Sequence, residues 1–357
     1  MRFFKSFLRL LLVSAIYWVI VFLFLIAIRY SGLKEELAFY IEEEFYLPVQ
    51  TYYINTIITG LVISVFYALI ETILDRWSRR LVVVFTILIK LFIYFILIVA
   101  ALTYSVYLLE LELDRDLPNE KGWWHKDLFF WTTVAYFLFA SIIFSLIRVA
   151  NDRFGRGNFL KILSGTYKRP KEEELVLMFL DLKDSTKIAE KLGHRLYSSF
   201  IQDCFKDLNT LLPKFDAEVY QYVGDEAVIS WSIKDGFKNN NCLNLFYGFQ
   251  KRLSKKQKYY QSNYGFQPMF KAGIHFGKVI VAEVGTIKKD LAFHGDVINT
   301  ASRIQGLCNA FNASVLVSEP VMDRLSISKT HYNIISEAIE LRGKEERLKI
   351  YAINYIQ

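Results

Sequence analysis

Residues 176–186 read VLMFLDLKDST, and this stretch decides how the second half of the 357-residue chain folds. An apolar run that only burial explains ends at Asp181, and a short polar turn follows it. The run is too short for a helix and charged segments bound it on both sides, so it predicts a central β-strand. Asp181 then stands at the end of that strand. A helix begins near Lys187, with Ser185 or Thr186 expected as its cap.

The polar turn after this strand predicts an anion site next to a cation site. Backbone N–H groups at the start of a helix bind anions, and an aspartate beside a bound anion needs a cation between the two. Residues 218–231, EVYQYVGDEAVISW, flank Gly224 and Asp225 with alternating apolar residues, which predicts a β-hairpin with Asp225 at its tip. Taken alone, Asp225 is as readily an ordinary turn residue. Two aspartates at the ends of neighbouring strands would share a pair of divalent ions.

The composition divides the chain into two unlike parts. Hydrophobic residues make up 53% of it and the mean hydropathy is +0.24, and nearly all of this excess lies before residue 150. The net charge of +7 does not indicate nucleic-acid binding, because the basic residues gather beside apolar spans, as membrane topology requires. The three cysteines, Cys204, Cys242 and Cys308, lack the spacing of a zinc site or a disulfide framework.

Four stretches in the first part are long enough to cross a lipid bilayer, which takes roughly 20 apolar residues each. They lie at about 7–28, 52–74, 81–107 and 128–147. The first is too long for a signal peptide and lacks a cleavage site, so we expect it to remain as an anchor. Basic residues flank the spans on one side and acidic loops on the other. The positive-inside rule therefore predicts a multi-pass protein of the inner (plasma) membrane, with both termini in the cytoplasm.

Lys90 is a charged residue inside the third of these spans. A charge within a membrane is costly and usually has a partner, which makes it a candidate functional residue. The alternative, which we favour, is that its stem snorkels to the nearby cytoplasmic face.

Three regions follow from this pattern: an all-α membrane domain at 1–150, a cytoplasmic linker at 151–171, and an α+β domain at 172–357. In the linker we expect a short amphipathic helix at about 158–163, at the membrane face or paired with a second copy. In the last region strands and helices alternate. Strands are expected at 217–223, 227–231, 270–274, 279–284 and 313–317, and helices at 187–192, 196–211, 243–257 and 299–307.

Residues 175–351 resemble the class III nucleotidyl cyclases. Four segments carry the resemblance, in the family's order: FLDL at 179–182, GD at 224–225, GIHFG at 273–277 and GDVINTASR at 295–303. The last matches the family's Gly-(Asp/Asn)-x-(Val/Ile)-Asn-x-Ala-(Ser/Ala)-Arg helix. The resemblance implies a ferredoxin-like palm core with a mixed, largely antiparallel sheet. It also implies conversion of ATP into cyclic AMP and pyrophosphate at sites shared across a homodimer.

The resemblance implies a role for each matching residue. Asp181 and Asp225, with Leu182, would hold two Mg²⁺ or Mn²⁺ ions per site, one activating the ribose 3′-hydroxyl and the other gripping the triphosphate. Asn299 and Arg303, one helical turn apart, would reach from the partner subunit to orient the ribose and neutralise charge on the α-phosphate. The other expected contacts are to phosphate, from Lys183, Asp184, Ser185, Thr186, Lys271 and Arg342, and to purine, from Gln221, Ala292 and Phe293.

Several of these positions have plainer interpretations. Lys271 and Arg342 are alternatively ordinary solvated basic residues, and His275, among apolar residues and glycines, is expected to be structural. Adenylate cyclases typically carry lysine and then aspartate or threonine where this chain has Gln221 and Ala292, and the guanylate pattern of glutamate and cysteine is equally missing. ATP is therefore expected from the family's frequencies alone.

Three alternatives stay open beside an adenylate cyclase. A guanylate or dual-specificity cyclase fits the same motifs. A catalytically silent nucleotide-binding or regulatory module would keep the fold, although it has no need for two metal carboxylates together with the Asn299 and Arg303 pair. A diguanylate cyclase is disfavoured, because Val223 and Ala227 break the hairpin motif of that fold.

Overall fold

The computed structural model describes residues 2–37, 49–77, 83–113, 128–154, 164–287, 289–327, 332–340 and 347–355. The chain divides into two compact units, Met1–Arg153 and Phe154–Gln357. The expected fold class is confirmed: apolar helices come first, and a domain with a mixed sheet and helices follows.

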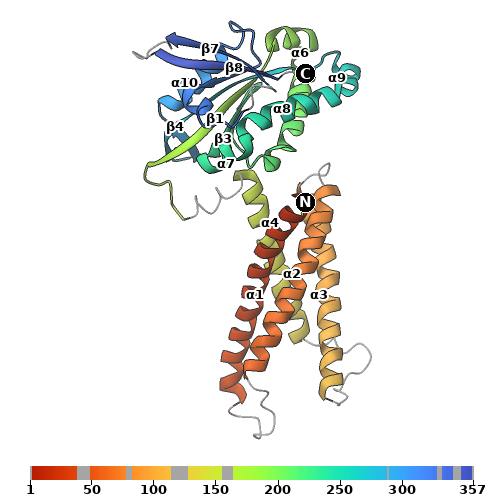
Figure 1. The fold of residues 1–357 in the computed structure, drawn as a ribbon. Coiled ribbons are helices and arrows are strands. Elements are labelled where there is room, and N and C mark those ends of the chain that lie inside the picture. The colour runs from red at the N-terminus through yellow and green to blue at the C-terminus, as the bar shows by residue number, and fades with distance from the viewer. Residues whose placement is uncertain are drawn as a thin grey trace. The chain divides into compact units, whose positions relative to one another are not determined.

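The first unit is a bundle of long α-helices (Figure 1), namely α1 (Arg2–Leu37), α2 (Val49–Trp77), α3 (Val83–Leu113) and α4 (Leu128–Phe154). Among the described residues, four segments are long and apolar enough to cross a membrane: Leu10–Ile28, Ile57–Leu74, Phe85–Tyr104 and Phe130–Ala150. The four predicted spans coincide with these helices in order. Each helix is longer than its apolar stretch, since the polar residues that flank the stretch are also helical.

Aromatic side chains fill the centre of this bundle. Trp18, Tyr67 and Tyr94 have no exposed surface, and the rings of the two tyrosines stack with their centroids 4.0 Å apart. The outward positions carry apolar side chains such as Phe92, which is 66% exposed. An apolar exterior around a packed interior with internal hydrogen bonds is the pattern that a lipid environment requires.

A cluster of charges lies inside this unit. Lys90 of α3 is only 8% exposed, and its Nζ atom lies 2.6 Å from Oε2 of Glu71 in α2. Glu71 is fully buried and also accepts hydrogen bonds from the hydroxyl of Tyr94, at 2.5 Å, and from the guanidinium of Arg148 in α4. The snorkelling interpretation of Lys90 is therefore wrong. A charge in a membrane needs a partner, and Glu71 supplies it.

The second unit is built on an eight-stranded sheet, counted over the residues that the structure describes. The strand order is β2-β3-β1-β4-β6-β8-β7, and β5 pairs with β4 outside this path. All paired strands are antiparallel except β4 and β6, which are parallel. The strands are β1 (Lys171–Leu182), β2 (Glu218–Val223), β3 (Glu226–Ser232), β4 (Phe270–Val284), β5 (Asp290–His294), β6 (Val315–Ser318), β7 (Tyr332–Glu340) and β8 (Arg347–Tyr355).

Helices cover both faces of this sheet (Figure 1). One face carries α6 (Ser185–Asn209), α8 (Asn241–Lys255) and α9 (Gln257–Tyr264), and the other carries α10 (Asp296–Gly306). The shorter pieces are α7 (Ile233–Phe237), α11 (Glu319–Met322) and the 3₁₀ turns η4 (Leu212–Lys214) and η5 (Lys238–Asn240).

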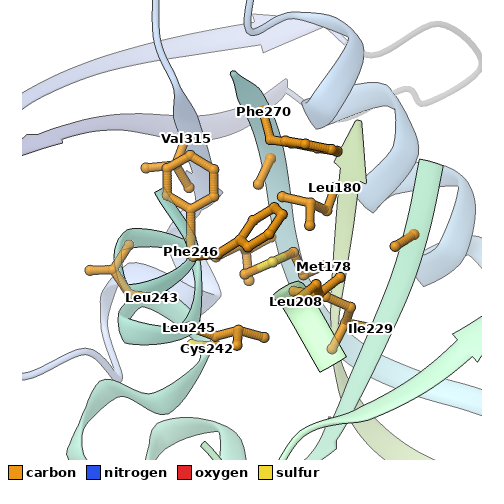
Figure 2. Close-up of a cluster of buried hydrophobic side chains, with 14 of the residues drawn as sticks. Met178, Leu180, Leu208, Ile229, Cys242, Leu243, Leu245, Phe246, Phe270 and Val315 are labelled. Carbon is orange, nitrogen blue, oxygen red and sulfur yellow. The ribbon is translucent and has the colours of Figure 1, made fainter. Parts of the chain in front are cut away.

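The alternation of side chains along β1 decides on which face Asp181 lies. Met178 points into the larger core under α8, where Figure 2 shows it beside Phe246. Phe179 points the other way and packs in a cluster that contains Ala301 of α10. Asp181 continues the second series, so β1 carries it to the α10 face of the sheet.

Most predicted elements are present, with differences that pairing explains. The helices expected at 187–192 and 196–211 form α6, broken at Gly193, where φ is 71°. The strands expected at 270–274 and 279–284 are one strand, β4, because it pairs with β1 along the full length of β1. The strands β5, β7 and β8 were not predicted. The expected amphipathic helix at 158–163 lies outside the described residues.

Tyr167 fastens the start of the second unit to its sheet. Its side chain is buried and its hydroxyl donates to Glu173 of β1 at 2.8 Å. Its carbonyl oxygen accepts a hydrogen bond from the N–H of Glu283 in β4 at 2.9 Å. The chain is thus held on both central strands before β1 begins.

Candidate active site

Carboxylates from neighbouring strands meet on the α10 face. Asp181, near the end of β1, lies opposite Glu226 of β3, and Asp225 lies in the two-residue turn between β2 and β3. Gly224 opens that turn with φ at 60°, a left-handed conformation that glycine adopts without strain. Burial raises the pKa of Asp181, and the negative charge of Asp225 raises it further. The two predicted metal carboxylates are therefore close enough for the charge of Asp225 to act on Asp181.

Glu226 adds negative charge to the same place. Burial raises its pKa, as do the charges of Asp181 and Asp225. Within the described residues no group of three or more acidic, histidine or cysteine side chains is arranged to hold a metal ion. Mg²⁺ typically binds one or two carboxylates and completes its shell with water and substrate phosphates. Two partly exposed carboxylates fit that chemistry.

Lys271 of β4 faces this acidic group. It lies opposite Asp181 in the β1–β4 register, and its Nζ atom is 3.3 Å from Oδ2 of Asp181. Its side chain is only 15% exposed, so it is not the ordinary solvated lysine of the alternative interpretation. Its positive charge opposes the rise in the pKa of Asp181.

Gln305 holds the same carboxylate from the helix above it. Its Nε2 atom donates to Oδ2 of Asp181 at 3.0 Å, and the residue is only 6% exposed. Helix α10 comes this near because β4 has Gly273 beneath it: a Cβ atom there would lie 2.3 Å from the backbone nitrogen of Gln305. Sequence reasoning missed Gln305. The signal was a long polar side chain on the buried stripe of α10, formed by Thr300, Ala301, Ile304 and Gln305.

Asn299 and Arg303 lie off the buried stripe of α10. Asn299 is exposed and Arg303 is partly exposed. In the described part of one chain, neither side chain makes a hydrogen bond or an ion pair. The pair is thus available to a group outside the chain, as the expected role in a partner's site requires.

The turn between β1 and α6 differs from the expected capped helix. Asp184, with φ at 57°, occupies the cap position without a side-chain hydrogen bond, so the prediction of Ser185 or Thr186 as the cap is wrong. The N–H of Lys183 donates to the carbonyl of Met269 at 2.8 Å, which leaves the first turn of α6 as the source of N–H groups for a phosphate. The carboxylate of Asp184 would repel a phosphate, so only its backbone could bind one.

Tyr197 of α6 lies beside this turn and was also missed by sequence reasoning. Burial and the charge of Asp225 raise its pKa to about 12, and a hydrogen bond with Ser185 opposes the shift. The side chain of Leu182 lies in the core and is 1% exposed, so only its backbone carbonyl is left to ligate a cation. His275 is buried, with Nδ1 2.7 Å from the hydroxyl of Ser318, as expected for a structural residue.

The predicted purine positions lie on β2 and β5, which Tyr220 joins. The ring of Tyr220 stacks on Phe293 with the centroids 3.9 Å apart, and its hydroxyl accepts the N–H of Phe293 at 3.0 Å. Gln221, next to Tyr220, is exposed, and Ala292, next to Phe293, is partly buried. The three purine positions thus come from two strands held together. Arg342 lies outside the described residues.

Known proteins are similar to this chain over the second unit. A family model described as the adenylate and guanylate cyclase catalytic domain matches residues 167–355. Adenylate cyclase 2 of Rhizobium meliloti (strain 1021) is 32% identical over 184 residues, 52% of this chain and 50% of the relative. The adenylate cyclase of Anabaena cylindrica is 26% identical over 186 residues, 50% of this chain and 36% of the relative. The chain therefore spans half or less of the length of these relatives.

A solved structure shares the fold. A bacterial light-regulated adenylyl cyclase superposes with a TM-score of 0.52 at 16% sequence identity, covering 64% of this chain and 66% of that chain. This likeness concerns the fold alone, because the sequences differ at most positions.

Proposed function

The chain belongs to the adenylate and guanylate cyclase catalytic-domain family, and on this basis we propose that it converts ATP into cyclic AMP and pyrophosphate. The observation that carries the proposal is a pair of carboxylates: Asp181 of β1, whose Oδ2 atom lies 3.3 Å from Nζ of Lys271, and Asp225 in the neighbouring β2–β3 turn, whose charge raises the pKa of Asp181. We propose ATP rather than GTP as the substrate because the relative of 32% identity is named an adenylate cyclase.

The carboxylates and one backbone carbonyl form the proposed cation site. Asp181 and Asp225 supply charged oxygens, and Leu182 supplies its carbonyl. Mg²⁺ or Mn²⁺, two ions per site, would supply activation of the ribose 3′-hydroxyl and charge neutralisation at the triphosphate. Lys271, which pairs with Asp181 in the free chain, would contact the leaving phosphates once a nucleotide is present.

The reaction is an in-line displacement, so it depends on positioning and charge dispersal more than on covalent help from the protein. The ribose 3′-hydroxyl loses its proton to solvent, and its oxygen forms a bond to the α-phosphorus. The bond from that phosphorus to the oxygen bridging to the β-phosphorus breaks, and pyrophosphate leaves with that oxygen. Arg303 would neutralise the charge that builds on the α-phosphate, and Asn299 would orient the ribose. Because both side chains lie off the buried stripe of α10, we propose that they act in the site of a second copy, as a homodimer.

The first unit supports a membrane location for this activity. Four helices of sufficient length and hydropathy, among the described residues, precede the cyclase domain. The basic residues beside these spans favour the inner (plasma) membrane with both termini in the cytoplasm, where ATP is present.

The experiment is to identify the product. The purified 357-residue chain is incubated in detergent with Mn²⁺ or Mg²⁺ and either ATP or GTP, and the nucleotides are separated by mass spectrometry. We expect cyclic AMP and pyrophosphate in equal amounts, and neither from an Asp181→Asn variant. Cyclic GMP as the main product would favour the guanylate alternative. A folded protein that yields no cyclic nucleotide under any of these conditions would favour the silent module.

A further inference from the structure

We propose that Gln305 is a positioning residue, which orients the carboxylate of Asp181 for cation binding and ties the cation site to helix α10. The inference rests on the proposed function, because it takes Asp181 to be a cation ligand. No motif used above contains Gln305, which follows Arg303 by two positions on a different side of the helix.

One oxygen of the Asp181 carboxylate has two hydrogen-bond donors beside it. Its Oδ2 atom receives the Nε2–H of Gln305 at 3.0 Å and lies 3.3 Å from the ammonium of Lys271. Two donors on one oxygen fix the rotation of the carboxylate and turn the other oxygen, Oδ1, away from them. A carboxylate held in this way meets a cation without first losing rotational freedom.

Burial and close packing hold the donor residue, Gln305, in place. Gln305 is 6% exposed, and its backbone nitrogen packs so closely on Gly273 that a Cβ atom there would lie 2.3 Å away. A Cβ atom at Gly273 would also lie 2.7 Å from the carbonyl oxygen of Ala301. This close contact fixes the position of helix α10 on β4. It therefore also fixes the position from which the amide of Gln305 reaches Asp181.

The chemistry of an amide explains the residue type. The site already gathers the carboxylates of Asp181, Asp225 and Glu226. A neutral amide donates a hydrogen bond without adding charge. It thus holds the Asp181 carboxylate in one orientation, whereas an apolar side chain would leave that carboxylate with one donor fewer.

The same helix carries Asn299 and Arg303 on another side, which gives the contact a consequence for the dimer. A change in the seating of α10 would move the pair that serves the second copy and the donor that serves the chain's own Asp181. The hydrogen bond from Gln305 to Asp181 thus joins the cation site to the helix that bears Asn299 and Arg303.

The test removes the amide and measures cation binding apart from turnover. Gln305→Met is similar in length and cannot donate, and Gln305→Leu serves as a second variant of this kind. Thr300→Val is the matched control, because it removes another buried polar group from the same stripe of α10 without touching Asp181. Each variant is made in the whole chain, and thermal unfolding confirms that it folds. Binding of Mn²⁺ alone is followed by the paramagnetic resonance signal of the unbound ion.

We expect Gln305→Met to weaken Mn²⁺ binding by about 10-fold to 100-fold, the range typical for partners that orient metal ligands. The Mn²⁺ concentration for half-maximal activity should rise by the same factor, while kcat at saturating Mn²⁺ is largely kept. Thr300→Val should change neither. Wild-type Mn²⁺ binding in both Gln305 variants, or a loss of kcat without a change in Mn²⁺ dependence, overturns the inference.

Asp181→Asn distinguishes a failure of the positioning role of Gln305 from a failure of the cation assignment. If Asp181→Asn loses Mn²⁺ binding and the Gln305 variants keep it, the positioning role fails and the proposed function stands. If Asp181→Asn also binds Mn²⁺ as the wild type does, the cation assignment itself fails, and the role of Gln305 falls with it.

Discussion

The ammonium of Lys271 lies 3.3 Å from the carboxylate of Asp181, across the paired strands β4 and β1. The chain thus places its own positive charge where the proposed reaction needs cations. Burial and Asp225 raise the pKa of Asp181, and Lys271 lowers it. This balance makes cation binding sensitive to pH and to the residue at position 271.

The first prediction concerns the acid limb of the activity profile. A carboxyl whose folded-state pKa is raised binds protons more readily than in the unfolded chain, so the cation-free protein loses stability as the pH rises through that raised value. Protons and cations compete for the same oxygens, so the apparent affinity for Mn²⁺ rises over the same pH interval. Lys271→Met removes the opposing charge and should shift the acid limb to higher pH.

This shift is measured as initial rate against pH at subsaturating Mn²⁺. Lys278→Met is the matched control, because Lys278 lies on the same strand and pairs with Glu172 instead, with Nζ 2.8 Å from Oε1. An acid limb that stays in place in Lys271→Met would show that this lysine does not set the titration of Asp181.

The second prediction concerns the two carboxylates. Asp181→Asn and Asp225→Asn should each lower turnover by at least about 100-fold, since each removes a ligand of the cations that would neutralise charge at the reacting phosphates. Both variants should stay folded in the presence of a chelator, as checked by thermal unfolding, because both side chains are only partly buried and each substitution removes one of two neighbouring negative charges. Near-normal turnover in either variant would refute the assignment of the cation ligands.

The third prediction concerns the membrane unit. Glu71→Leu removes the carboxylate that Lys90, Tyr94 and Arg148 share, across α2, α3 and α4. Removing one partner of a buried ion pair typically costs about 3–5 kcal/mol, so thermal unfolding in detergent should begin at a clearly lower temperature. Phe92→Leu, at an outward position of α3, is the control and should unfold as the wild type does. Equal stability of Glu71→Leu and the wild type would mean that the cluster does not hold the helices together.

The fourth prediction concerns the choice of purine. Gln221 is exposed and Ala292 lacks a polar side chain. We therefore expect the choice of base to rest on backbone contacts and pocket shape rather than on a dedicated ion or amide contact, and the preference for ATP over GTP to be modest. Such a contact is worth about 1–3 kcal/mol, and Gln221→Lys combined with Ala292→Asp should sharpen the preference toward ATP. The ratio of kcat/KM for the two nucleotides is the measure. An unmodified enzyme that already rejects GTP beyond detection would contradict this view of the pocket.

The local signals in the sequence could predict the elements that carry Asp181, Asp225 and Arg303. The apolar run before Asp181 can only be buried, the Gly-Asp pair makes a hairpin turn, and the α10 segment matches a family motif. The length of β4 could not be predicted, because β1 sets it through pairing.

Contacts between distant residues could not be predicted either. Gln305 meets Asp181 across 124 positions, and only the close packing of α10 on β4 brings them together. The partner of Lys90 depends on how α2 and α3 are rotated about their axes, which hydropathy alone does not report.

The central claim is that Asp181 and Asp225 of one chain act on the same nucleotide as Asn299 and Arg303 of a second chain. Two tagged copies of the chain, one with Asp181→Asn and the other with Arg303→Ala, are co-expressed, and the mixed dimer is isolated through both tags in succession. The mixed dimer holds one intact site and one doubly damaged site, so it should recover about half of the wild-type activity. Each variant alone should stay at background. Background activity in the isolated mixed dimer would contradict a site shared between two chains.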